Sequence, residues 1–190
     1  MKLRRGFKTE ANAYAREFRA ELGLVPHAPI CPWRLAGHLA IPVLPLSELN
    51  GEIPEVVGFF STQGRDAFSA ATVFRGVRRL VVHNDSHHLH RQAANIAHEL
   101  SHGILGHPPS PPLNDNGCRN FDSEIEDEAN WLGPAILVSE EAAIHIARQK
   151  IHMTEACQSY GVSDELMRMR LNVTGAYSRV ARQRGKVGGR

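Results

Sequence analysis

Apolar side chains recur at helical spacing in several parts of the chain, and the clearest run lies near its centre. Leucine, isoleucine and alanine residues between Leu89 and Leu105 repeat every three or four positions, as on one face of a helix. Polar capping residues precede the run at 84–86, and Gly106 ends it. The pattern predicts a helix over 86–105. Similar spacing predicts further helices over residues 9–22, 32–40, 121–138, 140–151, 154–160 and 163–171.

Shorter segments before the central helix are rich in β-branched and aromatic residues, which favour strands. Residues 55–61 and 66–74 form the first two predicted strands, joined by a turn at Gln63-Gly64. A second turn at Arg75-Gly76 leads into a third strand over 77–83. Connections this short favour antiparallel pairing. We therefore expect an α+β fold in which a small antiparallel three-stranded sheet packs against the central helix and further helices.

The central helix carries His98-Glu99-Leu100-Ser101-His102, an H-E-x-x-H motif. Residues four apart share one face of a helix, so the two histidines can bind one metal ion. Glu99 comes directly after the first histidine, where its carboxylate can act as a general base toward water. This arrangement is typical of zinc peptidases, and it predicts one Zn²⁺ per chain.

A second, acidic helix offers the third protein ligand that zinc needs. Glu124, Glu126 and Glu128 point in different directions from it, so only one of them is expected to reach the metal. We favour Glu126, because Asn130 lies four residues later on the same face and can hold the other ring nitrogen of a ligand histidine. Glu128 is the alternative third ligand.

Two blocks of the sequence resemble the ImmA/IrrE-type metallopeptidases. Residues 92–107, Gln-Ala-Ala-Asn-Ile-Ala-His-Glu-Leu-Ser-His-Gly-Ile-Leu-Gly-His, are similar to the active helix of that family, and Glu126–Asn130 is similar to its second block. The resemblance covers nearly the whole chain, residues 10–178. It implies zinc held by the two motif histidines and a glutamate of the second block, with Glu99 catalytic. The implied fold is a single zincin-like metallopeptidase domain over 9–178, with the motif on its active-site helix.

Basic residues are concentrated at the two ends of the chain. Residues 1–8 contain four basic side chains and residues 179–190 contain five, with no acidic side chain in either segment. We expect both segments to be basic tails, and the C-terminal one to be disordered because of its low apolar content. Basic ends are more often solubilising than functional, so direct binding of nucleic acid is not expected.

Composition and cysteine usage are those of a cytoplasmic domain with no membrane segment. No apolar run approaches the roughly 20 residues that span a bilayer. The basic N-terminus is not followed by an apolar signal-peptide core. Cys31, Cys118 and Cys157 are odd in number and far apart, which indicates reduced thiols.

These features predict a zinc-dependent endopeptidase in which Glu99 activates water for attack on a peptide bond. The resemblance implies a specific protein substrate, often a helix-turn-helix repressor, and hence a role in gene regulation. His107, close after the motif, is a candidate substrate contact, and the loop at 107–120 is expected to cover the cleft. The alternative is a non-catalytic, metal-stabilised interaction module, such as one component of a toxin–antitoxin-like pair. The presence of Glu99 disfavours this alternative, because a structural zinc ion needs no base.

Overall fold

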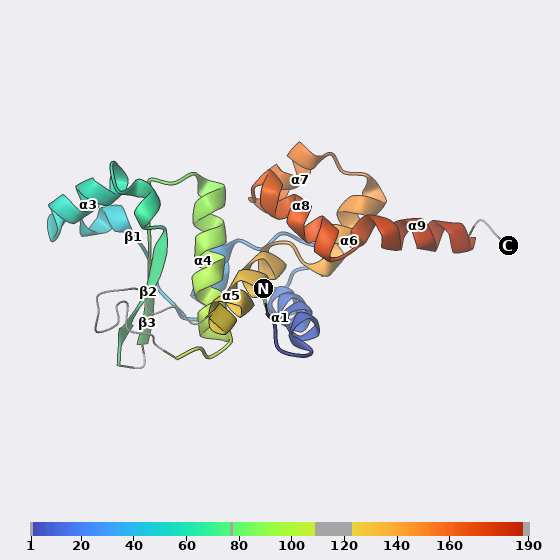
Figure 1. Ribbon diagram of the computed structural model, residues 1–190, viewed down its shortest axis with the longest axis horizontal. Helices are drawn as coiled ribbons and strands as arrows, with labels where there is room; N and C mark the ends of the chain where they lie inside the picture. Colours follow the sequence, from blue (N-terminus) through green and yellow to red (C-terminus); the bar gives the residue numbers. More distant parts are fainter. Residues whose placement is uncertain (1, 77, 109–122, 188–190) are drawn as a thin grey trace.

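Figure 1 shows the computed structural model, which describes residues 2–76, 78–108 and 123–187. The elements in these ranges are mostly helices, with one small sheet. None of these helices has the length and apolar character that crossing a membrane requires.

In chain order the elements are α1 (Phe7–Glu21), α2 (Pro32–His38), β1 (Val43–Pro45), a 3-10 helix (Leu46–Gly51), α3 (Pro54–Ser61), a second 3-10 helix (Arg65–Ala67), β2 (Ala70–Arg75), β3 (Arg78–His83), α4 (Leu89–Ile104), α5 (Ser123–Leu137), α6 (Glu140–Gln149), α7 (Met153–Tyr160), α8 (Asp164–Val173) and α9 (Ala176–Val187).

The sheet has three strands in the order β1-β3-β2. β3 pairs antiparallel with β2, where Val81 lies opposite Thr72, and parallel with β1, where Val81 lies opposite Val43. The α+β class is therefore confirmed, whereas the expectation of a wholly antiparallel sheet is wrong. The chain between β1 and β3 passes through α3 and β2, and this long connection allows the parallel return.

The segment 55–61, predicted as the first strand, forms α3 instead. Pro54 occupies the start of this helix, where its fixed φ and missing N–H are tolerated. The valines and phenylalanines that follow have high strand propensity, which explains the wrong prediction. Val57 is buried in a small core cluster with Leu46 and Val82. Packing against the sheet therefore decides the conformation of a segment whose composition favours a strand.

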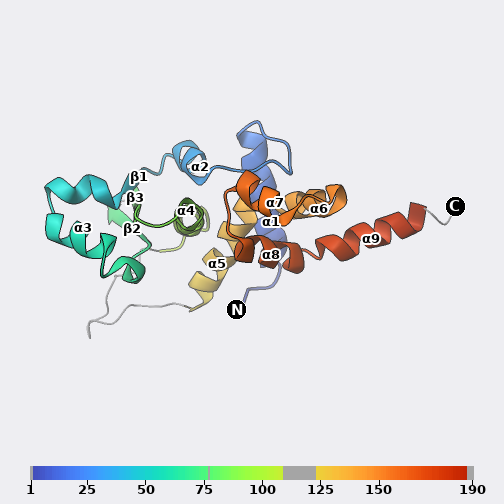
Figure 2. The same ribbon diagram turned by 90° about the horizontal axis from the view of Figure 1, so that it is seen from above.

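α4 lies between the sheet and the helices α1 and α5, and it contacts β2, β3, α2 and α5 (Figures 1 and 2). The predicted central helix is confirmed, although it begins at Leu89 rather than at residue 86. The cap is His88, whose Nδ1 accepts a hydrogen bond from the backbone N–H of His90. The buried face of the helix follows the predicted spacing and includes Ala93, Ile96, Ala97 and Leu100.

α5 packs directly along α4 and brings the acidic segment next to the motif. Gly133 allows this close approach. A Cβ atom at this position would lie 3.0 Å from the backbone nitrogen of His98 and 3.1 Å from the backbone carbon of Ala97. Because helix backbones in a packed interior cannot yield without cost, any side chain here would push the two helices apart.

Two buried arginines hold the C-terminal end of α5. Arg19 of α1 donates from Nη2 to the carbonyl of Ile136, and Arg170 of α8 donates from Nε to the carbonyl of Val138, both over 2.9 Å. The last carbonyls of a helix lack helical partners and form the negative end of its dipole, so guanidinium groups suit them. Burial lowers the pKa of both arginines to about 10, which leaves them charged at neutral pH.

The segments predicted as tails take part in the folded structure. Lys2 Nζ lies 2.6 Å from Glu124 Oε1, and Arg4 Nε lies 2.8 Å from Glu128 Oε1. At the other end, α9 packs against α6 and α8, and its Val180 is buried. Residues 179–190 were expected to be disordered, whereas the structure describes helix α9 as far as Val187, the last residue that it describes.

Candidate metal centre

The two histidines of the motif lie on the face of α4 that turns toward α5. The Nε2 atoms of His98 and His102 are 3.1 Å apart. Both side chains are mostly buried, with 23% and 17% of their surface exposed. The four-residue spacing on one helix therefore brings two imidazole nitrogens to a single point.

Glu126 of α5 brings a carboxylate to the same point. Its Oε2 lies 3.4 Å from His98 Nε2, and its Oε1 lies 3.7 Å from His102 Nε2. One donor atom from each of the three side chains lies within 4.8 Å of the others. Across residues 2–76, 78–108 and 123–187, this is the one group of three such side chains that could hold a metal ion.

The spacing of these donor atoms fits a tetrahedral zinc ion. Ligand atoms at the usual zinc distances of about 2.0–2.2 Å lie about 3.3–3.5 Å from one another around a tetrahedral centre. The two Nε2 atoms are 3.1 Å apart, the nearest Glu126 oxygen to each lies at 3.4 Å for His98 and 3.7 Å for His102, and one donor atom from each residue lies within 4.8 Å of the others, close to that range. Two imidazoles and one carboxylate are also a ligand set that catalytic zinc uses with a fourth position left for chemistry. The spacing and the chemical nature of the donors therefore both suit zinc.

Acidic neighbours favour a positive charge on His98 but not on His102. Burial lowers the pKa of His98, but hydrogen bonding and charge interactions with Glu126, together with the charge of Glu99, raise it above its ordinary value. A hydrogen bond with the side chain of Asn130 acts in the same direction. Burial, followed by the charge of His98, lowers the pKa of His102. The site thus favours one positive charge beside Glu126, which a proton or a metal ion can supply.

Glu99 does not belong to the group of three donors. Its Oε2 accepts a hydrogen bond of 2.6 Å from Oγ1 of Thr72 on the edge strand β2. The carboxylate is therefore held between α4 and the sheet, close enough to His98 to raise the pKa of that ring. A carboxylate that is oriented but is not itself a ligand suits a general base beside a metal ion.

Glu128, the alternative third ligand, faces other partners. Its Oε1 pairs with Arg4 Nε at 2.8 Å, and its Oε2 lies 3.4 Å from His107 Nε2. His107 Nδ1 in turn lies 3.0 Å from His102 Nδ1. Because His107 is only 8% exposed and its ring faces a motif histidine, this geometry does not favour the predicted substrate contact.

Three partners of the site were not predicted from the sequence: Thr72, Arg4 and Arg79. Arg79 donates from Nη2 to the carbonyl of His107 over 3.1 Å. The clustering of basic residues at 1–8 and of acidic residues at 124–128 was a usable signal, because opposite charge runs often pair. Neither Thr72 nor Arg79 carries a comparable signal. The loop expected to cover the cleft lies almost wholly at 109–122, outside the residues that the structure describes.

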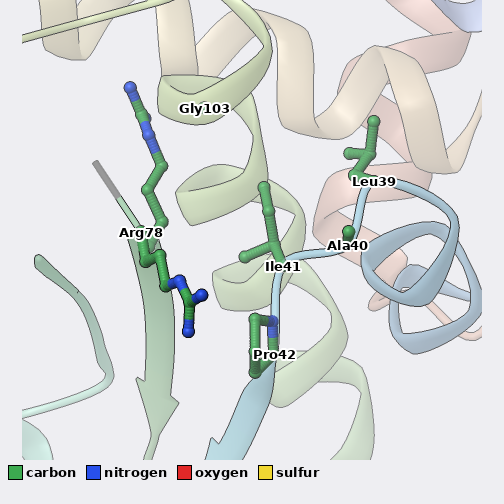
Figure 3. Close-up of a pocket in the computed structure, with 7 residues that line it drawn as sticks. Leu39, Ala40, Ile41, Pro42, Arg78 and Gly103 are labelled. Carbon is green, nitrogen blue, oxygen red and sulfur yellow. The ribbon is translucent and has the colours of Figure 1, made fainter. Parts of the chain in front are cut away.

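A cavity of about 560 Å³ lies beside α4 (Figure 3). It is lined by residues 39–42, by Arg78 and Arg79 of β3, and by Gly103 of α4. Figure 3 shows Ile41 and Pro42 on the side of the cavity opposite Arg78. None of the three donor side chains lines this cavity, so it is separate from the candidate metal centre.

Comparison with known proteins agrees with this geometry. No curated protein and no solved structure matches the chain significantly. The model of the peptidase M78 family, described as the IrrE N-terminal-like domain, matches residues 59–172. This range is more than half of the chain, and it contains β2, β3, the motif helix α4 and the acidic helix α5. The resemblance to ImmA/IrrE-type metallopeptidases is thereby confirmed, and the chain belongs to the peptidase M78 family.

Proposed function

We propose that the protein is a zinc-dependent endopeptidase whose metal ion is held by His98, His102 and Glu126. The observation that carries the proposal is the short distance between their donor groups: the two Nε2 atoms are 3.1 Å apart, and the two oxygens of Glu126 lie 3.4 Å from His98 Nε2 and 3.7 Å from His102 Nε2. It agrees with the roughly 3.3–3.5 Å between neighbouring ligands of tetrahedral zinc. Membership of a peptidase family supports a protein substrate.

The residues around the metal position have complementary roles in this proposal. A zinc ion bound there supplies Lewis-acid chemistry, which activates water and polarises a peptide carbonyl. Glu99 takes a proton from the attacking water on Oε1, while Thr72 holds Oε2 and fixes the orientation of the carboxylate. The same carboxyl group then donates the proton to the leaving amine. Asn130 keeps the ring of His98 oriented through their hydrogen bond.

The substrate that we propose is a specific regulatory protein in the cytoplasm, such as a helix-turn-helix repressor. This substrate class rests on the resemblance to the ImmA/IrrE-type enzymes. A peptidase that cut every exposed chain would damage its own cell, so recognition must depend on surfaces beyond the metal centre. General substrates such as casein are therefore expected to be poor ones.

Replacement of Glu99 by glutamine tests the proposal. The amide keeps the shape of the side chain but cannot accept the proton of water. Glu99→Gln should therefore retain one zinc ion per chain while cleavage falls by about 100-fold or more. Zinc content is measured by elemental analysis. Cleavage is measured by mass spectrometry after incubation with helix-turn-helix repressors of the host cell and with a mixed peptide library.

Glu124→Gln is the matched control, because Glu124 is 64% exposed and pairs with Lys2 at the surface. This variant should keep both zinc and cleavage. Cleavage by Glu99→Gln at the parent's rate would exclude Glu99 as the base. If the zinc-loaded parent cleaves none of the probes, the non-catalytic interaction module becomes the better hypothesis.

A further inference from the structure

We infer that His107, Glu128 and Arg4 form a positioning chain behind His102, which fixes the tautomer and the orientation of that ring. The inference rests on the proposed function only in taking His102 as a metal ligand. It assigns a purpose to three residues that are not among the three proposed metal ligands. It also makes the N-terminal segment a part of the metal centre.

The chain of contacts is continuous from the surface to the metal position. Arg4 Nε lies 2.8 Å from Glu128 Oε1, Glu128 Oε2 lies 3.4 Å from His107 Nε2, and His107 Nδ1 lies 3.0 Å from His102 Nδ1. His102 then presents Nε2 to Glu126 and His98. Exposure of the side chains decreases along this series of contacts, from 51% for Arg4 to 14% for Glu128 and 9% for His107. The inner contacts are therefore largely shielded from water.

The direction of the hydrogen bonds follows from the chemistry of each group. A carboxylate paired with arginine can only accept, so the Nε2–H of His107 donates to Glu128. When the His107 ring carries that one proton, its lone pair is on Nδ1 and accepts the Nδ1–H of His102. With its proton on Nδ1, His102 has a lone pair on Nε2, the atom that faces the other two donors. The chain thus selects the one neutral tautomer of His102 that can bind a metal ion through Nε2.

The backbone around His107 holds its ring in this position. The N–H of His107 donates to the carbonyl of His102 over 3.0 Å, and its own carbonyl accepts from Arg79 Nη2 over 3.1 Å. Gly106 adopts φ +66°, a left-handed conformation that suits glycine and turns the chain back toward the helix. His107 is therefore fixed at both of its backbone polar groups.

Arg4, at the outer end of the positioning chain, is held in place by contacts of its own. Its Nη1 and Nη2 donate to the two carboxylate oxygens of Glu10 over 2.6 and 2.8 Å, which leaves Nε for Glu128. Its guanidinium also lies over the ring of Phe7, 5.0 Å from the centroid. Arg5, the next residue, is exposed. Arg4 and Arg5 therefore form a matched pair in which one arginine belongs to the chain and the other does not.

The first experiment measures zinc affinity by competition with a chelator, with no peptidase assay. His107→Leu removes the acceptor for His102 and should weaken zinc binding about 10–100-fold, as loss of an outer-shell partner does. His107→Asn places an amide oxygen near the former Nδ1, so it should recover part of the loss. His90→Leu, at the opposite end of α4, is the control and should bind zinc like the parent. Equal affinity in His107→Leu and the parent would overturn the inference.

The second experiment reads the tautomer directly in metal-free protein by nitrogen-15 NMR of the histidine rings. His102 should carry its proton on Nδ1 in the parent and in Arg5→Gln. It should show a mixture of tautomers in His107→Leu, and a smaller shift in the same direction in Arg4→Gln. An Nε2–H tautomer of His102 in the parent would overturn the inference, even if His107→Leu fails to fold.

The two proposals fail in different ways. If the protein binds zinc and His102 has the predicted tautomer but no probe is cleaved, the positioning chain is supported and the peptidase function is not. If the His107→Leu variant keeps full zinc affinity and full cleavage, the peptidase function is supported and the positioning chain is not.

Discussion

Glu126 and Glu128 lie two positions apart on α5, yet their carboxylates have different neighbours. Glu126 lies within 3.7 Å of both motif histidines, whereas Glu128 is engaged by Arg4 and His107. A residue already paired with arginine would have to break that pair before it could reach a metal ion. The geometry therefore supports Glu126 as the proposed ligand and gives Glu128 a separate role.

The two glutamates should differ in how their loss affects zinc binding. Glu126→Ala should lose zinc on dialysis, because its affinity should fall by more than the roughly 10–100-fold typical of outer-shell changes. Glu128→Ala should still reach one zinc ion per chain at saturating zinc, with weaker affinity. Elemental analysis before and after dialysis measures both. Full zinc in Glu126→Ala, with loss in Glu128→Ala, would instead make Glu128 the third ligand.

The residues that could be predicted from the sequence are those whose geometry is local. His98, Glu99 and His102 lie within about one helical turn of each other, so the helical period alone fixes their relative positions. The partners of Glu99 and His102 come from other elements, Thr72 from β2 and His107 from beyond the end of α4. No periodicity encodes such contacts, because they depend on how whole elements pack.

At the scale of elements, the packing of α5 on α4 sets the distance between Glu126 and the two histidines. Gly133 lies where the two helices come close together, since an added Cβ would meet the backbone of His98 and Ala97 at 3.0–3.2 Å. The contact lies two turns along α5 from Glu126, so a displacement there moves the carboxylate relative to α4.

Gly133→Ala should therefore disturb both stability and metal binding. We expect the free energy of unfolding to fall by about 1–3 kcal/mol, which is typical of overpacking in a core. Zinc affinity should fall as well, because the donor atoms of α4 and α5 move apart. Chemical denaturation of the metal-free protein and chelator competition measure the two effects.

Gly58→Ala is the control for the Gly133 variant. Gly58 also lies inside a helix, but a Cβ there meets no atom within 4 Å. Alanine should leave zinc affinity unchanged and raise stability by up to about 1 kcal/mol, through its better helix propensity. If Gly133→Ala is stabilised to the same extent, the close approach of α4 and α5 does not restrict the size of the residue at position 133.

The elements that the sequence predicted well are those in which apolar residues keep a helical spacing over several turns. The helices that became α4 and α5 have buried stripes more than two turns long, and both are present. α3 has Val57 as its one buried residue, so its pattern contained too little periodicity to oppose its strand-like composition. The parallel pairing of β1 depends on a long-range return of the chain, which local turn signals cannot reveal.

Over the whole molecule, α5 connects two hydrophobic clusters. Leu132 and Ile136 belong to the cluster formed with α1, α2 and α4, which lies on the side of the metal centre. Leu137, at the end of α5, belongs to the cluster formed with α6, α7, α8 and α9. In Figure 1 these last helices lie on the opposite side of α4 from the sheet, and α9 extends away from them. The second cluster therefore supports the end of α5 that lies farther from Glu126.

α9 is held to this second cluster by apolar and ionic contacts. Ala176 and Val180 are buried, and Arg179 Nη1 lies 2.5 Å from Glu140 Oε1. The other oxygen of Glu140 accepts a hydrogen bond of 2.8 Å from Asn12 of α1. Glu140 thus ties α9 to α6 and α1. The basic composition of 179–190 hid this packing from the sequence analysis, because a few well-placed apolar residues were enough to anchor a helix.

Truncation of the C-terminus distinguishes a packed helix from a loose tail. Ending the chain at Gly175 removes the burial of Ala176 and Val180, which should lower the free energy of unfolding by about 2–3 kcal/mol. Ending it at Val187 leaves α9 whole and should change nothing. Zinc stoichiometry should stay at one per chain in both, because α9 contributes no donor to the metal centre. Thermal unfolding monitored by circular dichroism measures the first effect, and elemental analysis the second. Equal melting temperatures for the parent and the chain ending at Gly175 would support the original expectation that this segment is a disordered tail. Loss of zinc in the chain ending at Gly175 would show that α9 supports the metal centre through α5.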